Sequence, residues 1–199
     1  MTRRVYLAEI IGVLLMAWSC GGGPKHTDLT PPPSRDVVES APSWYRDPPA
    51  DADYLLGVST ATSRDMQLAV NKAQAEGRNQ IAQQLDVRFG TLAKRFQEEV
   101  GIGDDSELLD EFTQVYKAVT SEVLTGSRMR DQQIQTEGDI YRVYALMEMP
   151  IGAANQALLA KIRTREHLYT RFRASQAFKE LEDEITRYEE WKRHQEDRE

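Results

Sequence analysis

Residues 127–147 read SRMRDQQIQTEGDIYRVYALM, and this stretch decides the fold class. The pattern predicts one strand over about 127–135 and a second over 140–147, joined by the turn residues TEGD at 136–139. The second strand is apolar on both faces, so we expect it to lie in the centre of its sheet. The hairpin therefore predicts a small antiparallel sheet.

Upstream of the hairpin, the sequence predicts a strand over Tyr54–Val58, followed by a helix that opens at Ser63–Asp65 and runs to about Gln84. The helix is expected from residues that recur at helical spacing: Met66, Val70, Ala73, Gly77 and Ile81. A glycine costs about 1 kcal/mol in a helix interior. Small residues on this face therefore indicate that another backbone approaches closely, as when a helix lies on a sheet.

The stretch 85–93 alternates apolar and polar residues, which predicts another strand. A turn-prone GIGDD follows at 101–105, and Asp104 with Glu107 resembles a capping box. The next helix is expected to end at Gly126 and carries one apolar face, made of Leu108, Phe112, Val115, Val119 and Val123.

The C-terminal region, 151–195, predicts either one long helix or two helices with a bend near Ser175, where the apolar phase slips. Residues 161–179 are mostly basic and 180–199 mostly acidic. A straight helix of this length would span roughly 65 Å. It would leave several apolar side chains in water unless a partner covered them: Phe172, Phe178, Leu181, Ile185 and Tyr188.

These side chains are therefore candidate contacts with an envelope protein or with a second, antiparallel copy, so that the basic half would meet the acidic half. A hairpin folded back near Ser175 is the alternative. In either arrangement the segregated charges would be complementary.

The N-terminus predicts a lipoprotein signal peptide over 1–19. Arg3 and Arg4 precede the apolar stretch Ile10–Trp18, which is too short to span a bilayer. The sequence AWSC at 17–20 resembles a lipobox, although Trp18 is bulky where a small residue is usual. Cys20, the only cysteine, is thus expected to carry lipid and to anchor the protein to a membrane.

Residues 20–42 are rich in Gly, Pro, Ser and Thr, so we expect the lipidated cysteine and a flexible tether there, with a folded domain over 43–150. Gly21, rather than Asp, follows the cysteine, and by resemblance to Gram-negative sorting this favours the outer membrane, facing the periplasm or the surface.

No constellation of catalytic residues is visible in the sequence, so we expect no enzyme and no cofactor. The three histidines, His26, His167 and His194, have no neighbours at metal-ligand spacing. Gly101 and Gly103 form an isolated pair, which is weak as a phosphate loop. A net charge of −7 argues against nucleic acid as a partner.

Two aromatic residues, Trp44 and Tyr45, stand beside prolines at the edge of the expected domain. They predict either a plug at the open end of the core or a ligand platform. A cleft lined by Trp44 and Tyr141 would favour the second interpretation, a binding protein for a small ligand or peptidoglycan. Otherwise we expect a non-enzymatic scaffold or interaction module of the cell envelope.

Residues 42–150 resemble the Lpp-twenty family of bacterial lipoproteins. The matching stretches are APSWYRDPP at 41–49, YLLGVSTA at 54–61, the alanine-rich 69–82, and the closing segments 124–128 and 141–146. The resemblance implies a compact α+β domain, like one in the flagellar protein FlgT, and no known catalysis. Ser59 departs from the family, which often has glycine there, and the C-terminal helix lies outside it.

The lipoprotein interpretation predicts that Cys20→Ser releases the protein from membranes or blocks its processing, because the thiol accepts the lipid. Fractionation of cells expressing the full chain, with electrophoretic mobility as the second readout, checks this. A variant that stays in the membrane fraction with wild-type mobility would contradict the interpretation.

Overall fold

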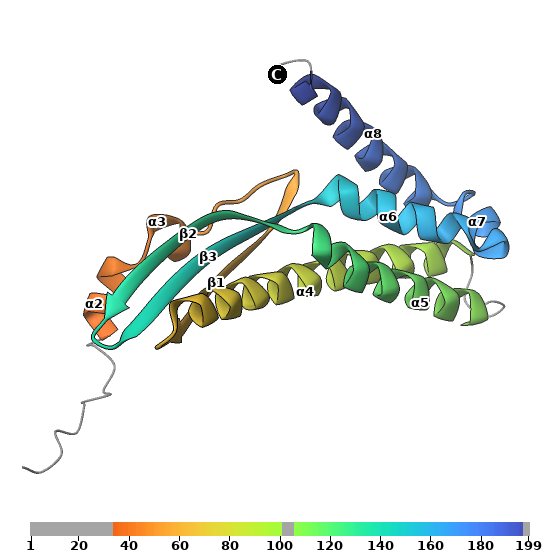
Figure 1. Ribbon diagram of the computed structural model, residues 1–199. Coiled ribbons are helices and arrows are strands. Elements are labelled where there is room, and N and C mark those ends of the chain that lie inside the picture. Colours follow the sequence, from red (N-terminus) through yellow and green to blue (C-terminus); the bar gives the residue numbers. More distant parts are fainter. Residues whose placement is uncertain (1–33, 101–105, 197–199) are drawn as a thin grey trace, which may run out of the picture. The chain divides into compact units, whose positions relative to one another are not determined.

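The computed structural model describes residues 34–100 and 106–196, within a compact unit that spans Pro33–Glu199. The signal peptide, Cys20, Gly101–Gly103 and the Asp104 cap lie outside these residues. The fold is α+β, as expected: helices accompany a three-stranded antiparallel sheet of order β1-β3-β2 (Figure 1). The strands are β1 (Tyr54–Ser63), β2 (Arg128–Glu137) and β3 (Ile140–Pro150).

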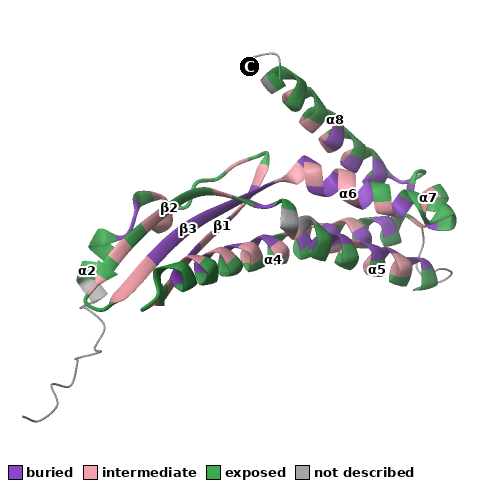
Figure 2. Ribbon diagram, in the orientation of Figure 1, coloured by how far each residue is buried: buried purple, intermediate pink, exposed green. Residues whose placement is uncertain are grey.

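The predicted hairpin is present, and β3 is the central strand. Glu137 pairs with Ile140 across a two-residue turn, in which Gly138 has φ of 57° and Asp139 does not have positive φ. That combination is the type II′ pattern, which matches the twist of the flanking strands. Residues 143–149 of β3 are all buried, because both faces of this strand are covered (Figure 2).

The expected strand over 85–93 is wrong: α4 (Met66–Val100) is one helix of 35 residues. Asp65 caps its start, since the Asp65 carboxylate accepts the Leu68 N–H at 2.7 Å. The apolar residues Leu85 and Phe89 continue the four-residue spacing of the preceding turns and are buried. Val87, which suggested alternation, is 72% exposed.

The buried residues of α4 form a stripe that winds around the helix: Ala69, Ala73, Gly77, Ile81, Leu85, Phe89 and Ala93. An α-helix has 3.6 residues per turn, so a spacing of four shifts the stripe by about 40° at each step. Its beginning packs on the sheet, where Ala69 and Ala73 meet Val143 and Ala145. Its later part packs in the helical core with Phe112 and Leu158.

The α4 and β1 backbones meet at two glycines. A Cβ added to Gly57 would lie 2.1 Å from the Gly77 carbonyl oxygen, and one added to Gly77 would lie 2.6 Å from Cγ of Met147. One turn away, the Ser59 hydroxyl donates to the Ala73 carbonyl at 2.6 Å. The small residues of α4 therefore serve close packing on the sheet, as the sequence indicated.

The second layer consists of helices packed along the later half of α4 (Figure 1). They are α5 (Ser106–Val123), the short 3-10 turn η1 (Leu124–Gly126), α6 (Ile151–Arg163), α7 (Glu166–Phe172) and α8 (Gln176–Glu196). The predicted bend at Ser175 is present, and a further break falls at Thr164–Arg165. The C-terminal region is thus folded back rather than straight.

The face of the sheet opposite α4 is covered by α2 (Ser34–Ser40), α3 (Ser43–Arg46) and the segment after them. The fold therefore begins inside the expected tether, and Ala41 is buried. An ion pair between the Asp51 carboxylate and Arg130 Nη1, 3.0 Å apart, links this segment to β2. Although burial opposes it, hydrogen bonds from the Asp53 N–H and Arg130 hold the pKa of Asp51 below its usual value.

Within the described residues, no helix combines the length and the apolar character that a membrane span requires.

The glycine contact predicts opposite outcomes for two Gly→Ala changes. Gly57→Ala should lower the free energy of unfolding by about 1–3 kcal/mol, because the new methyl group would meet the α4 backbone. Gly90→Ala, also on α4 but with its nearest atom 4.0 Å away, should raise it by roughly 0.5–1 kcal/mol. Urea unfolding followed by circular dichroism measures both, and equal effects would contradict the packing described.

Candidate functional site

Trp44 and Tyr45 cover the sheet rather than line a cleft. The Tyr45 ring packs edge-on against the buried Tyr144, with centroids 4.8 Å apart, and Trp44 packs against Tyr45. Tyr141 lies on the other face, against the α4 alanines. The expected cleft between Trp44 and Tyr141 therefore does not form, and the arrangement supports the plug interpretation.

The apolar side chains of the C-terminal region are used inside the fold. Phe172, Phe178, Leu181 and Ile185 belong to the central core. The Phe172 ring contacts Phe96 and Phe112 at centroid distances of 5.4 and 5.3 Å. These four side chains are therefore not left in water, as a straight helix would have left them, because α8 folds back onto its own chain. Tyr188 remains half-buried.

The segregated charges are also matched within the chain, but by other helices than expected. The basic residues Lys161 and Arg165 pair with Glu122 and Glu111 of α5, at 3.0 and 3.8 Å. The acidic residues of α8 pair instead with arginines of α4. These four ion pairs thus join the basic segment to α5 and the acidic segment to α4.

A groove of about 720 Å³ lies between α4 and α8, with β1 and α6 contributing to its lining. Its polar lining residues are Gln80, Gln83, Gln84, Arg88, Thr91, Arg95, Asn155, Glu180 and Glu184. Its apolar lining residues are Leu55, Val87, Phe89, Leu92 and Leu181. The groove therefore presents both polar groups and apolar surface, and α4 supplies most of its lining residues.

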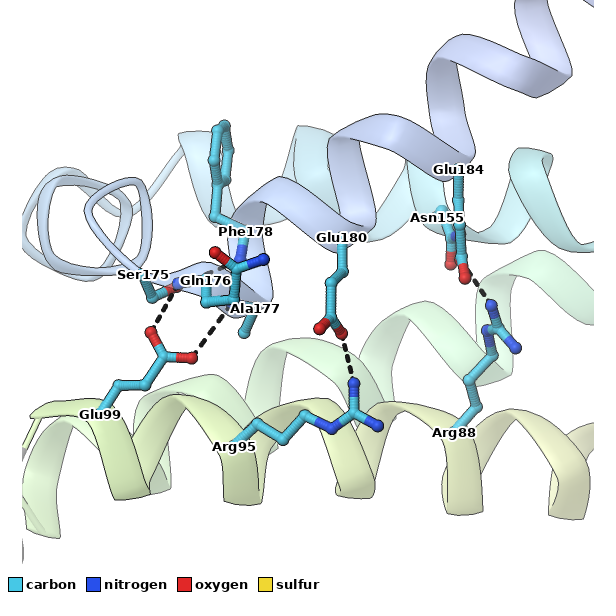
Figure 3. A network of polar contacts seen from close by, with 10 residues as sticks. All are labelled: Arg88, Arg95, Glu99, Asn155, Ser175, Gln176, Ala177, Phe178, Glu180 and Glu184. Atoms are coloured by element: carbon cyan, nitrogen blue, oxygen red, sulfur yellow. Dashed lines mark hydrogen bonds and ion pairs between the residues drawn. The ribbon is translucent and has the colours of Figure 1, made fainter.

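A three-residue network lies at the inner wall of the groove (Figure 3). The Glu184 Oε2 atom accepts hydrogen bonds from Arg88 Nη2 at 2.5 Å and from Asn155 Nδ2 at 2.6 Å. Asn155 is 1% exposed, and its Oδ1 has no hydrogen-bond partner among the described residues. Asn155 therefore acts on the groove through Glu184, whose carboxylate it holds beside Arg88.

Glu99 and Ser175 fix the start of α8 beside α4 (Figure 3). The Glu99 carboxylate accepts the backbone N–H groups of Gln176 and Ala177, at 2.5 and 3.3 Å. The Ser175 hydroxyl accepts the Phe178 N–H at 3.1 Å, so three N–H groups of the first turn are bonded. A second ion pair, Arg95 with Glu180, lies one turn further along α8. These contacts set the width of the groove.

Two glutamines of α4 are held in place by the outer edge of β1. Gln80 Oε1 accepts the Val58 N–H at 3.0 Å, and Gln84 Nε2 donates to the Leu56 carbonyl at 2.8 Å. β1 is an edge strand of the described sheet, so these amides satisfy backbone groups that would otherwise be open to another strand.

A smaller cavity of about 60 Å³ shares Arg88 and Glu184 with the groove. Its lining includes Tyr54, Tyr188 and Trp191. Tyr188 and Trp191 are stacked, with centroids 5.9 Å apart, and Tyr54 meets Trp191 edge-on at 6.0 Å. Burial raises the pKa of Tyr54, so its phenol stays protonated at neutral pH.

The lining of the groove contains no histidine, cysteine or serine, and both of its carboxylates are ion-paired with arginines. The described residues hold no cluster of three or more side chains suited to a metal ion. This arrangement is suited to hydrogen bonding and stacking.

Of the groove residues, sequence reasoning named Leu181 but missed the glutamines and the Arg88–Glu184–Asn155 network. The expected strand over 85–93 would have placed Arg88 and Arg95 on different elements. The partners Arg88 and Glu184 are 96 positions apart, and neither belongs to a recognisable motif. The one available signal was the run of glutamines at 80, 83 and 84, which share a helix face.

Comparison with known protein families gives a match. Residues 42–148 match the family model described as LPP20 lipoprotein, which covers β1, α4, α5, β2 and almost all of β3. A search of curated proteins finds no significant relative. The matched segment spans more than half of the chain and ends before α6, so α6, α7 and α8 lie outside it. The chain therefore belongs to the LPP20 lipoprotein family of cell-envelope lipoproteins.

Proposed function

We propose that this protein is a non-enzymatic binding module, anchored by lipid on Cys20 and exposed on the outer membrane toward the periplasm or the surface. Family membership supports an envelope lipoprotein. The signal peptide over 1–19, the lipidated cysteine and the outer-membrane location rest on the sequence of the N-terminus. Two or more acyl chains on the cysteine would make the attachment stable.

The groove between α4 and α8 is the observation that carries the proposal. It is the larger of the two cavities described above, and its polar side chains are held by contacts with β1, α6 and α8. Preformed concave sites with a few fixed polar groups are typical of ligand-binding proteins. The groove takes the place of both surfaces that the sequence suggested, around Trp44 and along the C-terminal apolar face.

A scaffold role through the C-terminal helix is the alternative, and it would use a different face of α8. Glu182, Asp183 and Glu190 are exposed there, so an envelope protein or a second copy would be held by charge rather than by apolar contact. Such pairing would weaken as the salt concentration rises.

Site-directed photocrosslinking in cells tests the groove as a binding site. Val87 is a 72% exposed residue of the groove, and Val38 is a comparably exposed valine on α2, at 59%. A photoreactive phenylalanine analogue in the full chain should give a discrete adduct at position 87 and none at position 38.

The adduct should also require an open groove. Thr91→Trp adds bulk to an exposed position of the groove lining and should abolish the adduct at 87 without loss of the protein from the membrane fraction. Adducts of equal yield at 87 and 38, or an adduct that persists with Thr91→Trp, would refute the groove as the binding site.

A further inference from the structure

The groove and the aromatic cavity beside it adjoin at one ion pair. Arg88 and Glu184 line both, so the two cavities meet at this pair. From Gln80 to Arg95 the α4 wall is roughly 22 Å long, at 1.5 Å per residue. A chain-like ligand can therefore lie along the groove and pass the aromatic residues beside this pair.

We infer that this ligand is a neutral glycan whose sugars carry acetamido groups, as in the sugar backbone of the bacterial cell wall. The inference rests on the proposed function and specifies the class of ligand. It follows from three observations: the charge of the lining, its amide groups and the aromatic residues of the adjoining cavity.

The charge of the groove favours a neutral ligand. Its four charged side chains form two ion pairs, Arg88 with Glu184 and Arg95 with Glu180, so the lining carries no net charge. A charged ligand would find no unpaired opposite charge in the groove, and it would lose its hydration on entering. Neutral groups that both donate and accept hydrogen bonds lose less hydration free energy on entering the groove.

The amides of the groove match hydroxyl and acetamido groups. Gln80 bonds to β1 through its oxygen and Gln84 through its nitrogen, so Gln80 Nε2 can donate and Gln84 Oε1 can accept. Both amides are fixed by β1, which lowers the entropy lost on binding. Asn155, buried in the groove wall, donates through Nδ2 to Glu184 and so holds that carboxylate in place at the lining of the groove.

The aromatic residues beside Arg88 and Glu184 offer exposed ring surface to the apolar C–H faces of sugar rings. Tyr54, Tyr188 and Trp191 lie together with their rings partly exposed. Aromatic side chains offer apolar surface beside a polar group, which is what a sugar presents in return.

An extended peptide is the competing occupant, and the edge of β1 disfavours it. A peptide that bound by strand addition would need the open backbone groups of this edge. The Val58 N–H and the Leu56 carbonyl are already bonded to Gln80 and Gln84. Strand addition would therefore have to break two hydrogen bonds of the fold.

Titration of the detergent-solubilised full chain with tetra-N-acetylchitotetraose tests the inference, with calorimetry for affinity and saturation-transfer NMR for contact. We expect saturable binding that Gln83→Ala weakens by about 3- to 10-fold, the loss of one or two hydrogen bonds. Gln67→Ala is the matched control, because Gln67 lies on the same helix outside the groove and bonds to Asn71. It should leave the affinity unchanged.

Cellotetraose, which lacks acetamido groups, should bind more weakly than tetra-N-acetylchitotetraose. Equal affinity for the two sugars, no binding at millimolar concentration, or insensitivity to Gln83→Ala in a variant of wild-type melting temperature would overturn the inference. If the sugar fails while the adduct at position 87 is a protein and depends on an open groove, the glycan is wrong and the groove stands as a binding site. If both fail, the proposed function falls as well.

Discussion

The close approach of α4 to β1 at Gly57 and Gly77 is the constraint on which the rest of the structure depends. It leaves no room for a side chain, so the helix can lie on the sheet in one position only. From that contact the apolar stripe of α4 winds toward the helical layer and buries Phe89 and Phe96 among α5 and the C-terminal helices. The 35-residue helix thereby contributes to both apolar cores, as does β3.

The groove is a consequence of the same helix. The first half of α4 holds Gln80 and Gln84 against the edge of β1, and its second half holds α8 through Arg88, Arg95 and Glu99. The ion pairs are partly exposed, so each contributes at most about 1 kcal/mol to stability. Their greater effect is on geometry, because they keep the two helices apart at a fixed distance and neutralise the charge between them.

The sequence predicted those features that depend on contacts between near neighbours. The hairpin could be predicted because Gly138 and the flanking apolar pattern act locally. The small residues around Gly77 likewise indicated that another backbone packs closely on the helix. The prediction of a strand over 85–93 was wrong because Leu85 and Phe89 fit both the two-residue spacing of a strand and the four-residue spacing of this helix. Only the exposure of Val87 distinguishes the helix from the strand. The groove was not predictable, since Arg88 and Glu184 meet only after the C-terminal region has folded back.

In this fold α8 lies on α4 of the same chain. Arg95→Lys places an amine opposite Glu180, and a carbodiimide can couple the two without a spacer because the native pair is in direct contact. Full-length protein labelled with ¹⁵N is mixed with unlabelled protein, coupled, digested and analysed by mass spectrometry. The account predicts a 95–180 crosslink in which both peptides always carry the same isotope. Crosslinked peptides of mixed isotope, or the absence of this crosslink, would contradict it.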